Sequence, residues 1–294
     1  MILIYRFIIN FFFPVIIAVI FLRTFFNKED KNRYKEKIYP SSYNVVRDKT
    51  RKLFWFHAAS IGELNSIIPL IKKLNTKNTD FLITTVTLSS SKLFFEEFKD
   101  SKNVIHRFLP VDKKKLVKKF IETWSPDLAV FVDSEIWPNF ILQIKKNKIP
   151  LYLLNARITK KTFLKWNLVP KTAKKIFQSF DLGLSYSKET KEYLKKLGLK
   201  EIKYYGNLKL ASEIKLNNLD EYNKIFLKKN KYWCAVSTHK EEDEFCIKTH
   251  KNLKEKYQDI KTIIIPRHID RVKKLKNLVT ILELTRKFYL KKKK

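Results

Sequence analysis

Glycine and cysteine are scarce in this sequence of 294 residues, which holds only four glycines and two cysteines. Cys234 and Cys246 have no CxxC partner and no histidine at metal-ligand spacing, which argues against a disulfide framework and against a cysteine-based metal site. We expect two free thiols in a reducing compartment and no bound metal. Because glycines are so few, one at a turn is informative, and Gly62 closely follows an apolar run.

Arginine is scarce as well, although the chain is strongly basic. The formal net charge is +33, yet only 10 of the 62 basic residues are Arg, and the 52 Lys are scattered through every segment. Proteins that recognise phosphate groups favour the bidentate fork of Arg, and no nucleic-acid recognition motif accompanies this charge. We therefore expect no nucleic-acid partner, and we predict that the charge attracts the protein to an anionic membrane surface.

A long apolar segment opens the sequence. Residues 2–22 are almost wholly apolar, and the interruptions are Tyr5, Arg6, Asn10 and Pro14. About 20 residues suffice for a helix to cross a bilayer, and the basic residues between 28 and 37 place the downstream side in the cytoplasm. A cleaved signal peptide is the alternative, but the segment is long and has no small-x-small site. We expect residues 1–26 to form a single-pass anchor in the inner membrane.

From residue 53 onward, short apolar runs alternate with amphipathic stretches, a pattern typical of a parallel sheet covered by helices on both faces. The expected strands are 53–57, 81–86, 104–108, 128–132, 151–154, 181–184 and 202–205, with helices such as 64–74, 112–123, 138–147 and 187–196 between them. After a polar stretch at 212–218, the expected elements are strands at 232–236 and 260–265 and helices at 241–257 and 268–279. We predict an α/β protein with a complete domain at 27–211 and an incomplete one at 212–294, because two strands and two helices cannot close a doubly wound domain.

The first expected strand runs directly into a helix through the sequence HAASIGE (57–63). Ser60 and Glu63 have the spacing of a capping box, in which two side chains bond to free backbone N–H groups at the start of a helix. Spacing alone favours this structural interpretation. The functional interpretation is that Glu63 lies at the carboxyl edge of a parallel sheet, where ligands bind, and takes a proton from an attacking hydroxyl group.

A second acidic sequence, DSEIWPN (133–139), follows the expected strand at 128–132. Pro138 suits the first turn of a helix, so Asp133 and Glu135 could be acids that the helix dipole favours. They could equally be two carboxylates in a cleft that orient a cationic or hydroxylated ligand. The residues themselves do not decide between these interpretations.

Further expected strands also end in sequences with binding chemistry. Arg157 follows the strand at 151–154, and it is one of only ten Arg in the chain. Backbone amides and hydroxyl groups at a strand-to-helix junction commonly hold phosphate, and an Arg can clamp it through charge-assisted hydrogen bonds. Each of these sequences also has an ordinary explanation as a surface pair or a helix cap. The candidate residues in them are Arg157, Gly206, Lys209, Ser237, Thr238, His239, Pro266 and Arg267.

Taken in order, the motifs HAASIGE, SEIWPN, NAR, GNLK, STH-x-x-E and PRH resemble those of the bacterial 3-deoxy-D-manno-octulosonic acid (Kdo) transferases of lipopolysaccharide synthesis. The resemblance runs from the apolar N-terminal segment to about Arg271. It implies a GT-B-like glycosyltransferase in which two Rossmann-like domains face a cleft, preceded by one transmembrane helix. In that family, the N-terminal domain handles the lipid A precursor and the C-terminal domain binds CMP-Kdo.

The resemblance also implies roles for residues of this chain. Glu63 matches the general base of the family, and Pro266 and Arg267 match its CMP site. The family inverts the anomeric centre and uses no cofactor or tightly bound metal, so CMP-Kdo and the lipid A precursor (lipid IVA) are the expected substrates. The other residues expected to bind substrate are Ser60, Gly62, Glu135, Arg157, Lys209, Ser237, Thr238 and His239.

The sequence departs from the family pattern after the PRH motif. The family continues with an acidic Met-Gly-Glu segment and a Gly-rich Asn-Pro-x-Glu segment, and residues 280–294 match neither. A frameshift, a premature stop or a split gene would produce this difference, and a partner chain could supply the segment. The reaction implied is Kdo transfer to the lipid A precursor by a catalytic domain in the cytoplasm. The alternative is an inactive, membrane-associated remnant that only binds acceptor or membrane surface.

Overall fold

The computed structural model describes the chain except for residues 44–47, 77, 212–220, 269–270, 273 and 276–294. The chain divides into two compact units, Met1–Glu213 and Ile214–Lys294. Each unit is an α/β structure whose strands are parallel.

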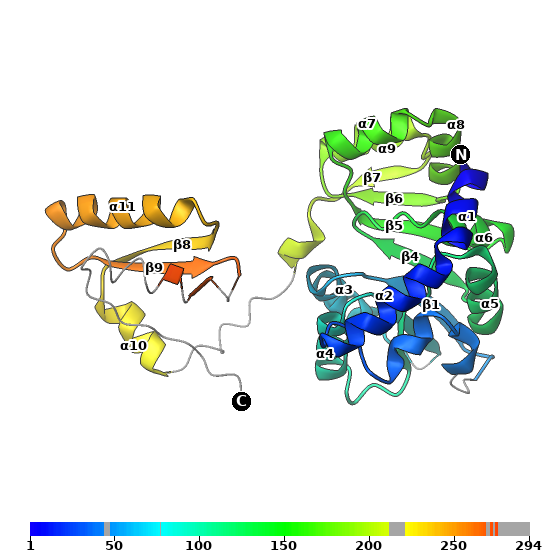
Figure 1. The fold of residues 1–294 in the computed structure, drawn as a ribbon, viewed down its shortest axis with the longest axis horizontal. Coiled ribbons are helices and arrows are strands. Elements are labelled where there is room, and N and C mark those ends of the chain that lie inside the picture. Colours follow the sequence, from blue (N-terminus) through cyan, green and yellow to red (C-terminus); the bar gives the residue numbers. More distant parts are fainter. Residues whose placement is uncertain (44–47, 77, 212–220, 269–270, 273, 276–294) are drawn as a thin grey trace. The chain divides into compact units, whose positions relative to one another are not determined.

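The N-terminal unit is built on one seven-stranded sheet in which every neighbouring pair of strands is parallel (Figure 1). The order across the sheet is β3-β2-β1-β4-β5-β6-β7. The strands are β1 (Lys52–His57), β2 (Thr79–Thr85), β3 (Val104–Phe108), β4 (Leu128–Val132), β5 (Leu151–Ala156), β6 (Leu182–Ser185) and β7 (Ile202–Tyr204). The predicted parallel sheet is confirmed. The strand order changes direction between β1 and β4, and open α/β sheets bind ligands at such a point.

Helices cover both faces of this sheet because successive residues of a strand point to opposite sides. On β1, the Trp55 ring centroid lies 5.2 Å from that of Phe120, whereas Phe56 packs in a second cluster with Ile67. Burying side chains of this size stabilises the fold by about 1.5–3 kcal/mol each. The helices are α3 (Ile61–Leu74) and α4 (Leu88–Glu97) on one face, and α5 (Lys114–Trp124), α6 (Pro138–Lys146), α7 (Lys160–Asn167), α8 (Pro170–Phe177) and α9 (Lys188–Leu197) on the other.

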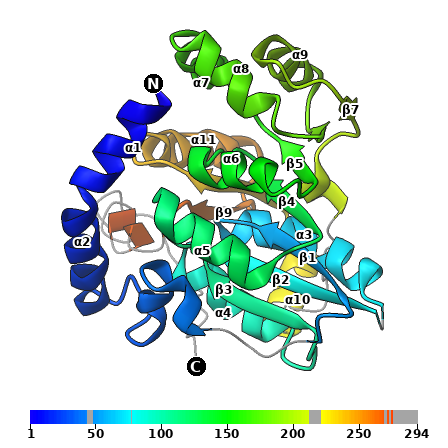
Figure 2. The ribbon, with the colours of Figure 1, turned by 90° about the vertical axis from the view of Figure 1, so that its right-hand side faces the viewer.

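The apolar N-terminal segment forms two helices, α1 (Ile2–Phe11) and α2 (Phe13–Phe25), which are bent by 56° relative to each other (Figure 2). The expected continuous helix over 1–26 is therefore wrong. Pro14 explains the break, because it has no N–H to donate to Asn10 and its ring would collide with that carbonyl in a straight helix. No single helix in the described part of the chain is long and apolar enough to span a membrane, whereas this bent pair qualifies by length and composition.

Two side chains attach α1 to the sheet. Tyr5 Oη donates to Asp112 Oδ2 at 2.6 Å, and Arg6 Nε donates to Asn139 Oδ1 at 2.8 Å. Asp112 lies in the loop after β3, and Asn139 is in the first turn of α6. These contacts fix α1 at the carboxyl edge of the sheet, beside the start of α6.

Two short 3-10 helices, η1 (Arg33–Lys37) and η2 (Pro40–Tyr43), lead from α2 towards the sheet. In η1, Glu36 Oε2 accepts the backbone N–H of Phe108 at 2.8 Å. Phe108 ends β3, which is an edge strand of the sheet. Glu36 therefore satisfies a backbone donor that an edge strand would otherwise leave open to pairing with another chain.

The C-terminal unit holds a two-stranded parallel sheet of β8 (Tyr232–Thr238) and β9 (Lys261–Pro266), with α10 (Glu221–Lys229) before it and α11 (Glu242–Lys256) between the strands. These elements agree with the predicted strands and helix, whereas the predicted helix 268–279 falls largely outside the described residues. Cys246 of α11 is buried and Cys234 of β8 is exposed, and both are free thiols. Val236 and Ile265 are also exposed, so this sheet buries less of its surface than the sheet of the N-terminal unit.

Candidate active site at the carboxyl edge of the sheet

The turn from β1 to α3 contains the first candidate residues. Ser60 is the N-cap of α3, and its Oγ accepts the backbone N–H of Glu63 at 3.4 Å. The Glu63 carboxylate turns back towards the strand, where Oε1 accepts the hydroxyl of Ser60 at 2.8 Å and Oε2 accepts the backbone N–H of Ala59 at 2.7 Å. The capping interpretation of this sequence is confirmed, with the carboxylate bonded one residue before the N-cap.

Capping leaves part of the Glu63 carboxylate available for chemistry. Each oxygen accepts one hydrogen bond within the described part of the chain, whereas a carboxylate has about four acceptor positions. Glu63 is 9% exposed. Gly62 leaves room beside it, since a Cβ at that position would meet nothing within 4 Å. A hydroxyl group of a substrate could therefore approach the carboxylate.

The surroundings of Glu63 increase its affinity for a proton. Burial raises the pKa of the Glu63 carboxyl above its usual value, and the negative charges of Glu135 and Asp133 raise it further. The hydrogen bonds from Ser60 and Ala59 act in the opposite direction and are outweighed. A raised pKa makes the carboxylate a stronger base, which is the property that a general base requires.

Asp133 and Glu135 lie directly after β4, the strand next to β1. Neither acid is in the first turn of α6, so neither caps that helix. The capping carboxylate comes from Asp112, whose two oxygens accept the backbone N–H groups of Asn139 and Phe140 at 3.0 Å. Burial raises the pKa of Asp112 from 3.8 to about 6, against hydrogen bonds that lower it. Sequence reasoning missed Asp112, because it lies far from the helix along the chain.

Glu135 is held by two side chains. Trp137 Nε1 donates to Glu135 Oε2 at 2.8 Å, and His57 Nε2 lies 3.3 Å from the same oxygen. His57 ends β1, so this contact joins two neighbouring strands at the carboxyl edge. Burial by itself would raise the pKa of the Glu135 carboxyl, but the hydrogen bond and charge of His57 and the bond from Trp137 lower it below its usual value.

Asp133 is held by a residue that follows β7. Lys209 Nζ donates to Asp133 Oδ2 at 2.8 Å, and Lys209 lies in η3 (Leu208–Ala211), which packs against α3. Asn155 near the end of β5 places η3, because its Oδ1 accepts the backbone N–H of Leu208 at 2.9 Å. Gly206 precedes η3 with a φ of 85°, a left-handed conformation that favours glycine. The lysine of the motif GNLK thus contacts Asp133, the first residue of the motif DSEIWPN.

Two residues of this edge hold unusual backbone conformations. Asp133 and Asn155 have φ angles of 64° and 52°, and non-glycine residues with such angles cluster at functional sites. The backbone N–H of Arg157 donates to the Asp133 carbonyl at 3.1 Å, while its side chain is exposed and its guanidinium lies 6.0 Å from the ring centroid of Tyr186. The charges of Asp133 and Glu135 thus act on Glu63, and Lys209 forms an ion pair with Asp133. Arg157 belongs to the same group of residues through its backbone hydrogen bond to Asp133.

The candidate residues of the C-terminal unit also gather at a carboxyl edge. Thr238 ends β8 and pairs with Pro266 at the end of β9, and the backbone N–H of Arg267 donates to the Thr238 carbonyl at 3.2 Å. The backbone N–H of His239 donates to Glu242 Oε2 at 2.7 Å, at the start of α11. The side chains of His239 and Arg267 are exposed. The five candidates that this edge brings together are Ser237, Thr238, His239, Pro266 and Arg267.

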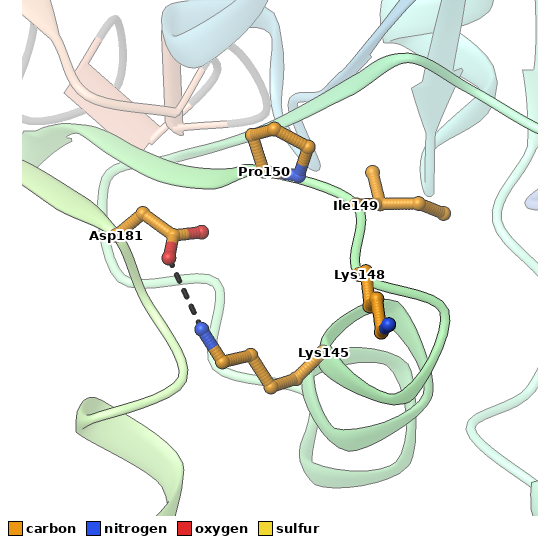
Figure 3. A pocket seen from close by; sticks show the side chains of 5 residues that line it. All are labelled: Lys145, Lys148, Ile149, Pro150 and Asp181. Atoms are coloured by element: carbon orange, nitrogen blue, oxygen red, sulfur yellow. Dashed lines mark hydrogen bonds and ion pairs between the residues drawn. The ribbon is translucent and has the colours of Figure 1, made fainter.

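A recess of about 210 Å³ lies at the opposite, amino-terminal edge of the N-terminal sheet (Figure 3). Lys145 Nζ donates to Asp181 Oδ1 at 3.1 Å across it, and Asp181 Oδ2 accepts the backbone N–H of Leu151 at 2.9 Å. The other lining residues are Lys148, Ile149 and Pro150. None of the motif residues lines this recess, so it is not the candidate site.

The partners of Glu135 are residues of this edge to which sequence reasoning assigned no role. His57 and Trp137 both stand within the quoted motifs, but their contact with one carboxylate depends on the pairing of β1 with β4. Within the described ranges, no group of three or more His, Cys, Asp or Glu side chains is arranged to hold a metal ion. The edge brings together three carboxylates, those of Glu63, Asp133 and Glu135.

Comparisons with known proteins agree with the motifs. The family model for 3-deoxy-D-manno-octulosonic-acid transferase (kdotransferase) matches residues 32–212. Two curated 3-deoxy-D-manno-octulosonic acid transferases, from Rickettsia bellii and Rickettsia prowazekii, are both 32% identical over 89% and 88% of this chain. The chain spans 62% and 59% of the length of these relatives.

A solved structure shares the fold. The UDP-GlcNAc 2-epimerase from Neisseria meningitidis, bound to UDP-GlcNAc, matches with a TM-score of 0.55 and 15% identity, over 79% of this chain and 69% of its own. At this identity the likeness concerns the fold alone.

Proposed function

Because the chain belongs to the 3-deoxy-D-manno-octulosonic-acid transferase family, we propose that it is an inverting glycosyltransferase that moves Kdo from CMP-Kdo to the lipid A precursor. One observation carries the proposal. A buried carboxylate, Glu63, lies at the carboxyl edge of the sheet beside two further acids that raise its pKa. This arrangement of acids disfavours the ionised form of Glu63. An inactive, membrane-bound remnant would gain nothing from such an arrangement.

The proposed reaction is one displacement at the anomeric carbon of Kdo. Glu63 takes the proton of the primary hydroxyl of the glucosamine acceptor, and the oxygen of that hydroxyl forms the new glycosidic bond. The bond from the anomeric carbon to the CMP phosphate breaks, and CMP leaves with the bonding electron pair on the opposite face. The proton then passes from Glu63 to solvent. General-base catalysis of this kind contributes a factor of about 10²–10⁴ to the rate.

The residues near Glu63 form the acceptor side of the proposed site. Ser60 and Gly62 border the carboxylate, with Ser60 holding one oxygen and Gly62 leaving space for the sugar. Glu135 and Lys209 offer a carboxylate and an ammonium group for the hydroxyl and phosphate groups of the acceptor. Arg157 has an exposed guanidinium that suits a phosphate of the lipid A precursor.

The carboxyl edge of the C-terminal unit forms the proposed donor side. Arg267 has an exposed side chain next to Pro266, and it can offset the charge of the CMP phosphate. Ser237, Thr238 and His239 lie at a strand-to-helix junction, where backbone N–H groups and hydroxyls favour an anion. We infer that the two units are the two Rossmann-like halves of a GT-B enzyme.

The N-terminal helices are proposed to hold the enzyme at the cytoplasmic face of the inner membrane. Large apolar side chains of α1 and α2 are exposed, among them Leu3, Phe7, Phe11 and Phe25 at 66–77%. Exposed side chains of this size and number are stable when a lipid phase covers them. The net charge of +33 adds attraction to anionic lipids.

A transfer assay tests the proposal. Membranes that contain this chain are incubated with labelled CMP-Kdo and a tetraacyl lipid A precursor, and a precursor whose primary hydroxyl is blocked serves as the matched control. We expect label in the lipid product only with the free hydroxyl. Absence of transfer from the wild-type chain, in membranes where it is folded and present, would contradict the proposed activity.

A further inference from the structure

His57 is a buried residue whose two ring nitrogens both have partners. It is fully buried, at 0% exposure, at the end of β1. Nδ1 lies 3.1 Å from the backbone oxygen and 3.0 Å from the hydroxyl oxygen of Thr84 on β2, and Nε2 lies 3.3 Å from Glu135 Oε2 after β4. The imidazole thus links β2 to the loop after β4, a few residues from Glu63 in the sequence.

The partners of the ring assign the hydrogen on Nε2. Nδ1 lies near both the backbone oxygen of Thr84, which can only accept, and the Thr84 hydroxyl, which can donate, so this side of the ring fits Nδ1 with or without a hydrogen. The ionised Glu135 carboxylate can only accept, so its contact with Nε2 requires a hydrogen on Nε2, because a lone pair facing a carboxylate would be repulsive. Trp137 Nε1 donates to the same oxygen of Glu135 at 2.8 Å, which favours the ionised carboxylate. The geometry therefore describes a hydrogen bond from the buried His57 imidazole to the Glu135 carboxylate.

The two acids around Glu63 each have a nitrogen donor as partner. Asp133 is paired with Lys209 at 2.8 Å, and Glu135 is paired with His57 at 3.3 Å. These are the charged groups that β1, β4 and η3 bring towards the Glu63 carboxylate. Without its partner, the half-buried carboxylate of Glu135 would bind a proton more readily and lose part of its fixed orientation.

We propose that His57 is a positioning residue of the transfer reaction, which holds Glu135 ionised and fixed beside Glu63 and does not itself touch substrate. The inference rests on the proposed role of Glu63 as general base. The negative charge of Glu135 disfavours ionisation of Glu63 and so makes Glu63 a stronger base. Loss of His57 therefore acts on catalysis through Glu135, at a distance from the reacting atoms.

A spectroscopic experiment tests the pair without any enzyme activity. The chain has five histidines, so protein labelled with nitrogen-15 only in histidine gives few ring signals, and His57→Asn identifies the signal of His57. We expect Nε2 of His57 to carry a hydrogen in the wild type, and its signal to shift in Glu135→Gln, where the carboxylate that accepts this hydrogen is gone. A His57 Nε2 without a hydrogen in the wild type, or an Nε2 signal that Glu135→Gln leaves unchanged, would overturn the proposal.

A double-mutant cycle tests the consequence for catalysis. His57→Asn keeps a donor for Thr84 but loses the contact with Glu135, and we expect kcat/KM to fall about tenfold, the usual scale for one lost hydrogen bond to a charged group. The acid limb of the pH profile should move to lower pH, to the position found for Glu135→Gln. In the Glu135→Gln background, His57→Asn should change neither quantity further. His57→Gln can offer an amide N–H to Glu135 and should recover part of the activity.

His106→Asn is the matched control, since His106 is also buried, at 3% exposure, and lies on β3 with no contact to Glu135. It should leave the acid limb in place. If His57→Asn also leaves the acid limb in place, or lowers kcat/KM equally with and without Glu135, His57 is merely structural and the proposal is wrong. If the wild type shows the hydrogen on Nε2 and its signal shifts in Glu135→Gln, but the protein transfers no Kdo, the proposed function fails while the pairing of His57 with Glu135 stands.

Discussion

The two units of this protein use a glutamate in the same way at the start of a helix. In the N-terminal unit, Glu63 Oε2 accepts the backbone N–H of Ala59 at 2.7 Å. In the C-terminal unit, Glu242 Oε2 accepts the backbone N–H of His239 at 2.7 Å. Both junctions follow the carboxyl end of a parallel strand and belong to a motif of the family. The capping hydrogen bond alone therefore cannot tell which glutamate is a base.

The surroundings of the two glutamates differ. Glu63 is 9% exposed and has Asp133 and Glu135 close enough to raise its pKa, whereas Glu242 is exposed. The difference arises from the sheets, because strand β1 is covered on both faces and flanked by β2 and β4, while several side chains of β8 are open to solvent. Burial and neighbouring charge, supplied by the sheet, turn a capping carboxylate into a candidate base.

The largest expected effect contrasts the two glutamates directly. Glu63→Gln preserves the shape of the side chain but removes the proton acceptor, so transfer of Kdo should fall at least about 10²-fold. Glu242→Gln removes a capping carboxylate on an exposed helix start and should leave transfer far less affected. Both variants should keep the wild-type circular dichroism spectrum. Equal losses of transfer activity in the two variants would show that the burial of Glu63 does not contribute to catalysis.

A second contrast compares valines on the two sheets. Val132 on β4 is fully buried and Val236 on β8 is 64% exposed. Val132→Ala should lower the free energy of unfolding by about 2 kcal/mol, since it removes buried methyl groups, whereas Val236→Ala should change it by no more than about 0.5 kcal/mol. Hydrogen exchange read separately for β4 and β8 measures each effect in its own unit. A larger effect at β8 would mean that its exposed face is covered in solution.

A third and smaller effect concerns Asp112, which ties α1 to the start of α6. Its pKa is raised from 3.8 to about 6, so between these pH values the folded state holds a proton that the unfolded state has lost. The free energy of unfolding should therefore fall as pH rises through this window, and the fall should level off above about pH 6.

Asp112→Asn should remove this pH dependence and weaken the helix cap by about 1 kcal/mol. Tyr5→Phe, which removes only the hydroxyl donor, should keep the dependence and extend it to higher pH, because the Tyr5 hydrogen bond lowers the pKa of Asp112. Urea unfolding at several pH values measures all three proteins. An unchanged slope in Asp112→Asn would assign the dependence to another group.

Much of this architecture could be predicted from local sequence. The alternation of β1, with Trp55 and Phe56 facing opposite clusters, follows from strand periodicity, and the capping of α3 follows from the spacing of Ser60 and Glu63. The break between α1 and α2 could also have been predicted locally, from Pro14, but the continuous hydropathy of the segment favoured one helix.

The electrostatics of the site could not be predicted in this way. His57 and Glu135 are 78 positions apart, and Asp133 and Lys209 are 76 apart. These pairs form only because β1 lies beside β4 and because η3 returns to α3, and neither neighbourhood can be derived from the alternation of strands and helices. The motifs identified most of the residues at the edge, whereas the strand order determines which of these residues pair with one another.

The pH dependence of kcat/KM is the most direct test of the claim that Glu63 is a base tuned by its sheet. We predict that the wild type loses activity along an acid limb above pH 4.5, the usual pKa of a glutamate, because the Glu63 pKa is raised. Glu242→Gln should keep this limb, and the residual activity of Glu63→Gln should lack it. A Glu63→Gln variant that retains the wild-type acid limb would contradict the account, because another group would then be the base.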